Sequence, residues 1–337
     1  MAAVPLEAER REAAAAVAAA GLLRTPLIAA PGLSRELGCE VRLKLECHQL
    51  TGSFKARGAV AAVAQVPATE TVVTASAGNH GIGIAFACRH LGRRAQILVP
   101  SGTNPAKVDA LERFGESVEV EVVDGSYDDT EVAARAAAAA PGTRFVSSYN
   151  DPMVVAGQST VASEIIEQWP EAEAIVVPVG GGGLLSGVAL ACAAADRGVA
   201  AWGVEPEWSP TMTTSLTAGE AVRVVEEHTS RAEGLVGNLD PDTITFGLVR
   251  DHATGVVIAT EDEILAGTAR VYAEAATVVE VSAGASLCGL TAAAVGGGKR
   301  LVAVLSGANI AAANHFEIIA EWAPRPASAP LGAGAPE

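Results

Sequence analysis

Short runs of β-branched apolar residues alternate along the chain with longer, alanine-rich stretches of helical character. This alternation is typical of βα units, in which helices connect the strands of a parallel sheet. The pattern predicts strands at 71–74, 95–99, 118–123, 174–179, 201–204, 256–259, 278–281 and 301–305. Thr260 and Glu263 predict a helix start, because each side chain can bind the backbone amide of the other residue. We therefore expect an α/β fold.

Three predicted strands are followed by a turn rich in small residues and then by a helix-like run, at 74–83, 179–187 and 305–311. In parallel sheets, ligands bind at the carboxyl ends of the strands. One of these turns contains the consecutive glycines Gly180, Gly181, Gly182 and Gly183. Glycines leave backbone amides accessible, and the following helix directs its positive end to the same place. This loop predicts a phosphate-binding site.

Lys55 stands in the stretch KLECHQLTGSFKARGA, directly after Phe54 and before a helix-like run. A nucleophilic amine has to be uncharged and held in position, which partial burial near a phosphate site provides. Pyridoxal phosphate matches both features, because its aldehyde can react with a lysine and its phosphate can bind to glycine amides. The sequence therefore suggests this cofactor.

A second hypothesis comes from Glu205, which closes a predicted strand after the glycine loop. Dinucleotide-binding folds place a ribose-binding carboxylate roughly 20 residues beyond their glycines. Ser186 and the register of Gly187 depart from that fingerprint, which requires glycine or alanine at a fixed offset. An NAD-dependent oxidoreductase thus remains an alternative from a different enzyme class.

Composition narrows the classes of function and the location. The 337 residues are 50% hydrophobic, enough for a large folded core, and the net charge of −16 disfavours binding to nucleic acid or an anionic membrane. The N-terminal apolar run at 13–23 is too short to span a bilayer. Five scattered cysteines without a C-x-x-C pair indicate a reducing compartment. We expect a cytoplasmic protein.

Four motifs occur in order: the Lys55 stretch at 44–59, SAGNHG at 76–81, GGGGLLSG at 180–187 and LSGAN at 305–309. Together they resemble the fold-type II pyridoxal-phosphate enzymes, specifically the serine/threonine dehydratase and serine racemase branch. The similarity runs from Arg24 to about Asn309, which is most of the chain. It implies a tryptophan synthase β-like fold, with two open twisted α/β domains and the cofactor between them.

The same resemblance implies a domain organisation. The large cofactor-binding domain comprises 1–60 and 150–323, and a small mobile domain comprises 61–149. Residues 324–337, rich in Pro, Ala and Gly, are predicted to form a disordered tail. We expect no C-terminal effector-binding domain of the kind found in biosynthetic threonine dehydratases, and we expect a homodimer.

The resemblance also implies roles for individual residues. Lys55 corresponds to the lysine that forms the Schiff base, and Phe54 lies beside the pyridine ring. Asn79 would bind the ring hydroxyl, and Ser306 would face the ring nitrogen. The phosphate would bind to the backbone amides of Gly180, Gly181, Gly182 and Gly183. The substrate carboxylate would bind to the loop formed by Ser76, Ala77, Gly78, Asn79 and His80.

The implied activity is that of a carbon–oxygen lyase. A small L-β-hydroxy amino acid, threonine or serine first, would undergo α,β-elimination to a 2-keto acid and ammonia. Two alanines favour this reaction within the branch, since racemases carry a proton-transferring serine at the position of Ala77 and threonine synthases tend to have aspartate at that of Ala56. The alternatives are elimination from another β-substituted amino acid such as hydroxyaspartate or phenylserine, racemisation, and β-replacement.

A metal site is not predicted. Glu205 and Pro206 resemble the start of the divalent-cation site of this branch. However, Thr211 stands where an aspartate ligand is expected, and hard cations require several charged oxygen ligands. A structural hydrogen bond from Glu205 is the alternative that we favour.

Overall fold

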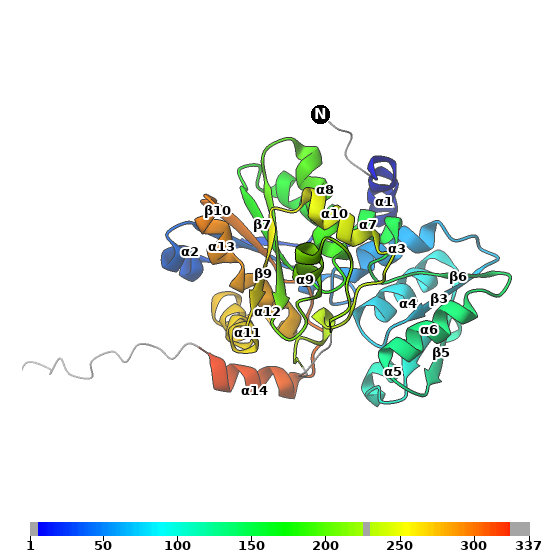
Figure 1. Ribbon diagram of the computed structural model, residues 1–337. Helices are drawn as coiled ribbons and strands as arrows, with labels where there is room; N and C mark the ends of the chain where they lie inside the picture. Colours follow the sequence, from blue (N-terminus) through cyan, green and yellow to red (C-terminus); the bar gives the residue numbers. More distant parts are fainter. Residues whose placement is uncertain (1–5, 225–229, 324–337) are drawn as a thin grey trace, which may run out of the picture.

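The computed structural model describes residues 6–224 and 230–323, and the predicted tail at 324–337 lies outside them. The described strands form two separate sheets (Figure 1). A six-stranded sheet has the order β1 (Leu27–Ala29), β2 (Glu40–Lys44), β10 (Arg300–Val304), β7 (Ala174–Pro178), β8 (Ala200–Pro206) and β9 (Gly255–Ala259). A four-stranded sheet has the order β5 (Val118–Val123), β4 (Arg94–Pro100), β3 (Thr71–Ala75) and β6 (Thr143–Phe145). Only β1 pairs antiparallel, so the predicted parallel α/β architecture is confirmed for the described residues.

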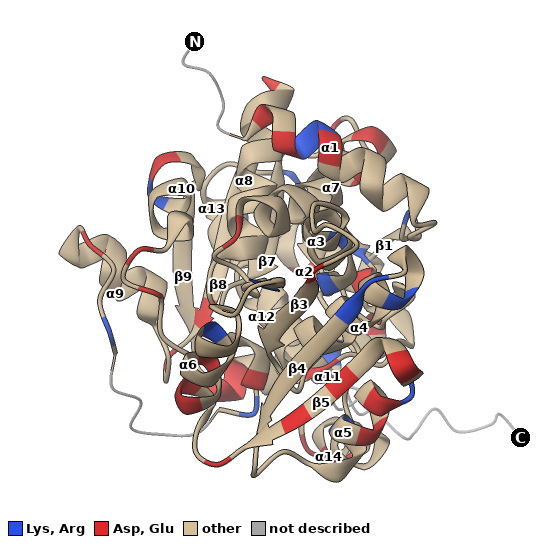
Figure 2. Ribbon diagram, turned by 90° about the vertical axis from the view of Figure 1, so that its right-hand side faces the viewer, with Lys and Arg blue, Asp and Glu red and all other residues tan. Residues whose placement is uncertain are grey.

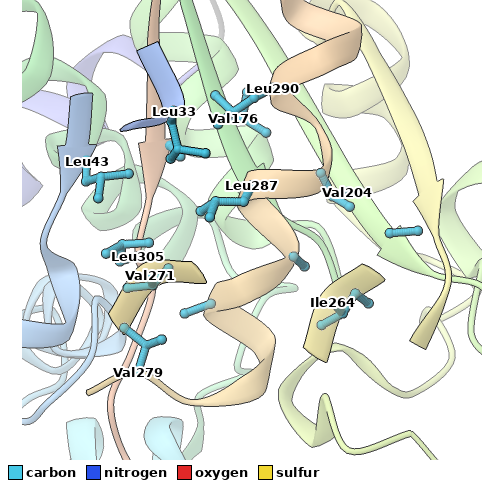
Figure 3. Close-up of a cluster of buried hydrophobic side chains, with 14 of the residues drawn as sticks. Leu33, Leu43, Val176, Val204, Ile264, Val271, Val279, Leu287, Leu290 and Leu305 are labelled. Atoms are coloured by element: carbon cyan, nitrogen blue, oxygen red, sulfur yellow. The ribbon is translucent and has the colours of Figure 1, made fainter. Parts of the chain in front are cut away.

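Helices cover both faces of the six-stranded sheet, and the side chains of its strands alternate between two cores. Ala174 and Val176 of β7 face one core, whereas Ile175 and Val177 face the other, as the twofold repeat of a strand requires. The first core is formed with helices α2 (Pro31–Leu37), α11 (Glu261–Ala275), α12 (Val281–Cys288), α13 (Leu290–Val295) and α14 (Ala312–Trp322). Figure 3 shows part of it, where side chains of the sheet and of α12 meet.

The second core of this sheet lies under α7 (Pro152–Gln168), α8 (Gly183–Ala195), α9 (Thr211–Ala218) and α10 (Ile244–His252). The four-stranded sheet packs against α4 (Asn79–Leu91), α5 (Pro105–Glu112) and α6 (Tyr127–Ala137). No described helix combines the length and the apolar character needed to cross a membrane.

Helix α3 (Lys55–Ala64) connects the two halves, because it packs on α4 of one half and on α7 of the other (Figure 1). Helix α1 (Glu7–Ala19) covers α3 and α7. The contact between α3 and α7 is close: a Cβ on Gly157 would lie 2.5 Å from the Cα of Gly58. Only glycine allows this approach. The packing places α3, with Lys55 as its first residue, between α4 and α7.

Most predicted strands are present, with ends that differ by at most two residues. One prediction is wrong: residues 278–281 form no strand, because Val281 starts α12 and the preceding extended residues join neither sheet. The predicted capping box of Thr260 and Glu263 is confirmed at the start of α11. The sequence pattern missed β1, β2 and β6, which are short or carry charged residues.

The surface reflects the acidic composition. Strand β5 is an edge strand of the four-stranded sheet, and Figure 2 shows acidic positions in red along it. Its exposed residues include Glu119 and Glu121. Charged residues on an exposed edge prevent pairing with the edge of another sheet. The described cysteines are all free, as expected for thiols that act as small apolar residues (Cys39, Cys47, Cys88, Cys192 and Cys288).

Candidate active site

The site begins where the segment before α3 meets the carboxyl end of β10. The Phe54 amide donates to the Ser306 carbonyl at 3.0 Å, and the Ala308 amide donates to the Gly52 carbonyl at 2.8 Å. Ser53 and Gly307 form an antiparallel bridge between these two contacts. Residues more than 250 positions apart therefore lie side by side, and Lys55 stands next to the buried Ser306.

Lys55 is partly buried, and its Nζ donates to the Ser148 carbonyl at 3.0 Å. The same nitrogen lies 5.4 Å from the centre of the Phe54 ring. Burial lowers the pKa of Lys55 to about 8, although the negative charge of Glu280 acts in the opposite direction. About half of the amine is thus uncharged at pH 8, which suits a nucleophile or a base.

Asn79 is the first residue of α4, and both ends of its side-chain amide are bound. Its Nδ2 donates to both carboxylate oxygens of Glu280 at 2.9 Å, and its Oδ1 accepts from Nδ2 of Asn309 at 2.6 Å. Asn309 also donates to the Thr51 carbonyl at 3.0 Å. These contacts connect the Lys55 segment, the start of α4 and the segment after β10.

The loop Ser76, Ala77, Gly78 connects β3 to α4. Its Gly78 amide donates to the Ser76 hydroxyl at 3.2 Å. His80 is buried, and its Nε2 lies 3.2 Å from the Val146 carbonyl. Burial and then the charge of Lys55 lower the pKa of His80 to about 3, so the ring is neutral. Because a carbonyl can only accept, Nε2 carries the proton and Nδ1, which has no partner among the described residues, is an acceptor.

The glycine loop lies between β7 and α8, as predicted. Gly182 has φ +82°, and a Cβ there would lie 2.6 Å from Cε of Met212. Gly181 and Gly183 pack against Tyr149, the neighbour of Ser148, which brings the loop close to the Lys55 amine. Within the described part of the chain, the amides of residues 180–182 donate to no backbone carbonyl. These amides remain available to an anion at the start of a helix.

Glu205 does not point into this site. Its buried carboxylate accepts from the Met212 amide at 2.6 Å and from the amide and hydroxyl of Thr213 at 2.7 Å. It therefore caps the start of α9, which corrects the ribose-binding hypothesis, since its oxygens are already bound. Burial raises the pKa of Glu205 to about 7. Among residues 6–224 and 230–323, no group of three His, Cys, Asp or Glu side chains is arranged to hold a metal.

Sequence reasoning missed two contributors to the site. Glu280 was missed because residues 278–281 were wrongly predicted to form a strand. Its contact with Asn79 also joins residues 201 positions apart, which a local pattern does not reveal. Ser148 acts through its carbonyl, for which a side-chain pattern gives no signal. The glutamate at the start of a helix was the one local hint available.

The residues that the structure brings together fit pyridoxal phosphate. A partly buried amine with a lowered pKa, Lys55, suits an aldehyde, and free amides at a helix start suit a phosphate. The aromatic ring of Phe54 lies near the same amine, and backbone and side-chain contacts connect Ser306 and Asn79 to the segment that carries it. The unpartnered Nδ1 of His80 marks a further polar group in this region that the described protein atoms leave unsatisfied.

Comparisons with known proteins agree with this geometry. The L-threonine ammonia-lyase of Thermotoga maritima is 38% identical over 85% of this chain and 71% of that protein. The structure of processed threonine deaminase isoform 2 from Solanum lycopersicum has a TM-score of 0.86 at 30% identity, over 93% of this chain and 87% of that one. Maize serine racemase has a TM-score of 0.83 at 27% identity, over 93% and 96%. The profile "Pyridoxal-phosphate dependent enzyme" matches residues 18–307, and the chain therefore belongs to this family.

Proposed function

We propose that this chain is an ammonia-lyase that uses pyridoxal phosphate to convert L-threonine or L-serine to a 2-keto acid and ammonia. The observation that supports it best is the Lys55 amine, which is partly buried, has a lowered pKa and lies close to a loop of free glycine amides. The names of the similar threonine ammonia-lyase and threonine deaminase point to the same reaction.

The cofactor would be held by residues from both halves of the molecule. Lys55 would provide the covalent attachment, Phe54 would lie beside the ring, Asn79 would bind the ring hydroxyl and Ser306 the ring nitrogen. The phosphate would bind to the amides of Gly180, Gly181, Gly182 and Gly183. When bound, the cofactor supplies an electron sink that makes the Cα–H of an amino acid acidic.

The chain's own residues then bind the substrate and move protons. Ser76, Ala77 and Gly78 precede α4, and Asn79 and His80 begin it, so unpaired amides at the helix start can bind a carboxylate. His80 is neutral and adds no positive charge there. Lys55, once free, is an uncharged amine that accepts the proton from Cα, and the hydroxyl leaves Cβ with the bonding electrons.

Ala77 decides between elimination and racemisation. Racemisation requires a proton donor on the face of Cα opposite to Lys55, and a methyl group cannot carry a proton. The hydroxyl of Ser306 cannot keep a ring nitrogen protonated as a carboxylate would, which favours prompt loss of the leaving group. We therefore propose elimination as the main reaction, in preference to the racemisation that the name of the similar maize serine racemase indicates.

The first experiment is spectroscopic. Purified protein with pyridoxal phosphate is expected to be yellow, and borohydride should fix the cofactor to Lys55, as peptide mass spectrometry would detect. A panel of β-substituted amino acids, led by threonine and serine, should yield 2-keto acid and ammonia. A colourless protein that binds a nicotinamide dinucleotide would contradict the proposal, and a yellow protein that releases no keto acid would contradict the ammonia-lyase activity alone.

The substitution Ala77→Ser tests the stereochemical argument. It should introduce measurable racemisation of serine, whereas the unsubstituted protein should show little. Chiral chromatography of the reaction mixture measures both. The absence of any gain would remove the support for the missing-base explanation.

The remaining proposals concern organisation. We assign 1–60 and 150–323 to a large domain and 61–149 to a small domain that closes over the substrate, since each sheet is built from strands of one of these parts. A cytoplasmic homodimer is proposed on the resemblance and the free cysteines. Size-exclusion chromatography with light scattering would measure the mass of the assembly.

A further inference from the structure

Glu280 is a partly buried carboxylate that the proposed mechanism does not use, and it binds the Asn79 side chain of the Lys55 site. Its carboxylate accepts a hydrogen bond from the side chain of Asn79 and another from the backbone amide of Asn309. A Cβ on Gly307 would lie 2.6 Å from its Oε1, so the absence of a side chain there makes room for the carboxylate. Burial raises the pKa of Glu280, and the hydrogen bond from Asn79 and the positive charge of Lys55 partly offset this effect. Keeping a charged carboxylate in this place costs free energy, and such groups are typical of functional sites.

The contact with Asn79 has a direction that can be read from its chemistry. A carboxylate only accepts, so the NH2 end of Asn79 must face Glu280 and its oxygen must face Asn309. The two carboxylate oxygens subtend a narrow angle at Nδ2, whereas the two N–H bonds diverge. One N–H is therefore shared between both oxygens. The second N–H stays available to a ligand oxygen.

The electrostatic environment is also defined. The Glu280 carboxylate lies beside Gly307, which forms a bridge with Ser53, so its negative charge acts on the nearby Lys55. Among the described residues, the other titratable groups coupled electrostatically to this pair are Cys47, His80 of α4 and Lys107 of α5. Burial and neighbouring carboxylates raise the pKa of Cys47 to about 12, so its thiol is uncharged. His80 is neutral, and the Lys107 ammonium is bound to Glu233 at 2.7 Å. Glu280 is thus the negative charge that offsets the cost of burying the Lys55 ammonium.

We infer that Glu280 is a positioning residue of this site: it fixes the Asn79 amide with one N–H directed to the ligand, and it supplies a negative charge near Lys55. The first part rests on the proposed function, because the ligand oxygen belongs to the cofactor. The second part concerns the protein alone. Replacement by glutamine removes the charge, and it weakens the orientation of Asn79, because a glutamine can present either its oxygen or its NH2 group to that amide.

Glu205 provides a matched control. It is a buried carboxylate in the same half of the molecule that accepts three hydrogen bonds, but its partners belong to α9. Glu205→Gln therefore removes a buried charge without touching Asn79 or Lys55. A general effect of losing a buried carboxylate should appear in both variants, and a specific effect only in Glu280→Gln.

The first test uses the full chain stripped of cofactor. Acetic anhydride at a series of pH values on both sides of 8, with peptide mass spectrometry of Lys55, measures the fraction of neutral amine. The midpoint is expected near pH 8 for the unsubstituted protein. It should fall by about 1 pH unit in Glu280→Gln and stay unchanged in Glu205→Gln. An unchanged midpoint in Glu280→Gln would overturn the electrostatic part.

The second test measures the affinity for pyridoxal phosphate by absorbance titration. Glu280→Gln and Asn79→Ala should each weaken binding by about tenfold, since each loses one hydrogen bond to a charged partner or ligand. The double variant should be no weaker than the weaker single variant, because both changes affect the same amide. Fully additive losses would overturn the positioning part.

Folding is checked by circular dichroism. If Glu280→Gln does not fold, Glu280→Asp replaces it: the charge is kept and the carboxylate is withdrawn, so the midpoint should hold and the affinity should fall. A protein that binds no cofactor in any form contradicts the proposed function, and the labelling profile of Lys55 still decides the electrostatic part.

Discussion

Two lysines lie in the interior of this protein, and they are bound in opposite ways. Lys44 is fully buried, and its Nζ donates to Glu164 at 2.6 Å, to Gln168 at 2.9 Å and to the Thr25 carbonyl at 2.9 Å. Lys55 donates to a single neutral carbonyl, that of Ser148. Lys44 thus uses all three of its N–H groups, whereas Lys55 keeps donors for a ligand.

Lys44 belongs to a cluster that is electrically balanced. Arg57 donates to Glu46 and Glu164 at 2.6 to 3.0 Å, and Thr25 donates to Glu46 at 2.5 Å. The two positive and two negative side chains cancel. Burial by itself lowers the pKa of Arg57, but the carboxylates of Glu46 and Glu164 outweigh it and raise the pKa. The cluster joins β2, α3 and α7 directly beneath the site.

The comparison separates structure from reactivity. Burial lowers the pKa of both lysines, but the Lys44 charge is compensated by a carboxylate at hydrogen-bond distance. A buried amine whose hydrogen-bond donors all have partners has a structural role. A buried amine with unused donors can react with a ligand. Both arise from the same stretch of sequence, eleven positions apart, so the difference lies in what surrounds them.

The largest effect is expected for Lys55→Ala. Removal of the amine should lower kcat for keto-acid formation by about 10³-fold or more, because attachment and proton transfer both depend on it. The free energy of unfolding should change little. Stopped assays and chemical denaturation measure the two quantities, and substantial activity in this variant would contradict the assignment of Lys55.

Arg57→Leu breaks the other member of the comparison. It leaves Glu46 and Glu164 buried with fewer partners, so the free energy of unfolding should fall by about 3–5 kcal/mol. Urea denaturation followed by circular dichroism checks this value. Stability equal to that of the unsubstituted protein would show that the cluster is not a major support of α3.

Lys44→Met is expected to have a smaller effect. Methionine has a similar length, and Glu164 keeps its contacts with Arg57. A loss of about 1–3 kcal/mol is expected, with kcat retained at temperatures where the variant is folded. If Lys44→Met abolished activity in a folded protein, the separation between a structural and a reactive lysine would fail.

The smallest effect is the dependence of stability on pH in the protein stripped of cofactor. The folded pKa of Lys55 is about 8, below its ordinary value of 10.5, so the unfolded chain binds more protons between these values. Stability should rise across this window, by about 1 kcal/mol after screening by solvent. Lys55→Met should remove this rise relative to the unsubstituted protein, and identical slopes would indicate an ordinary pKa for Lys55.

Much of the architecture could be predicted locally. The strand at 118–123 has the predicted bounds, and the glycine loop lies between a strand and a helix as expected. The failures have a common cause. Glu40–Lys44 was missed because a charged residue such as Lys44 enters a sheet only when distant carboxylates bind it. The segment 278–281 was mistaken for a strand because three of its four residues are valines. The hydrogen bond between Glu280 and the distant Asn79 leaves no local pattern.

The sequence by itself determined the features that depend on neighbouring residues: the order of strands and helices, the anion-binding loop of glycines, the helix caps and the presence of a lysine in a loop of small residues. The tertiary structure alone decided how each lysine is bound, because partners are brought from 93 positions away for Lys55 and 120 for Lys44. It also decided that Glu280 belongs to the site and Glu205 does not. Charge compensation acts through space, and local patterns carry no record of it.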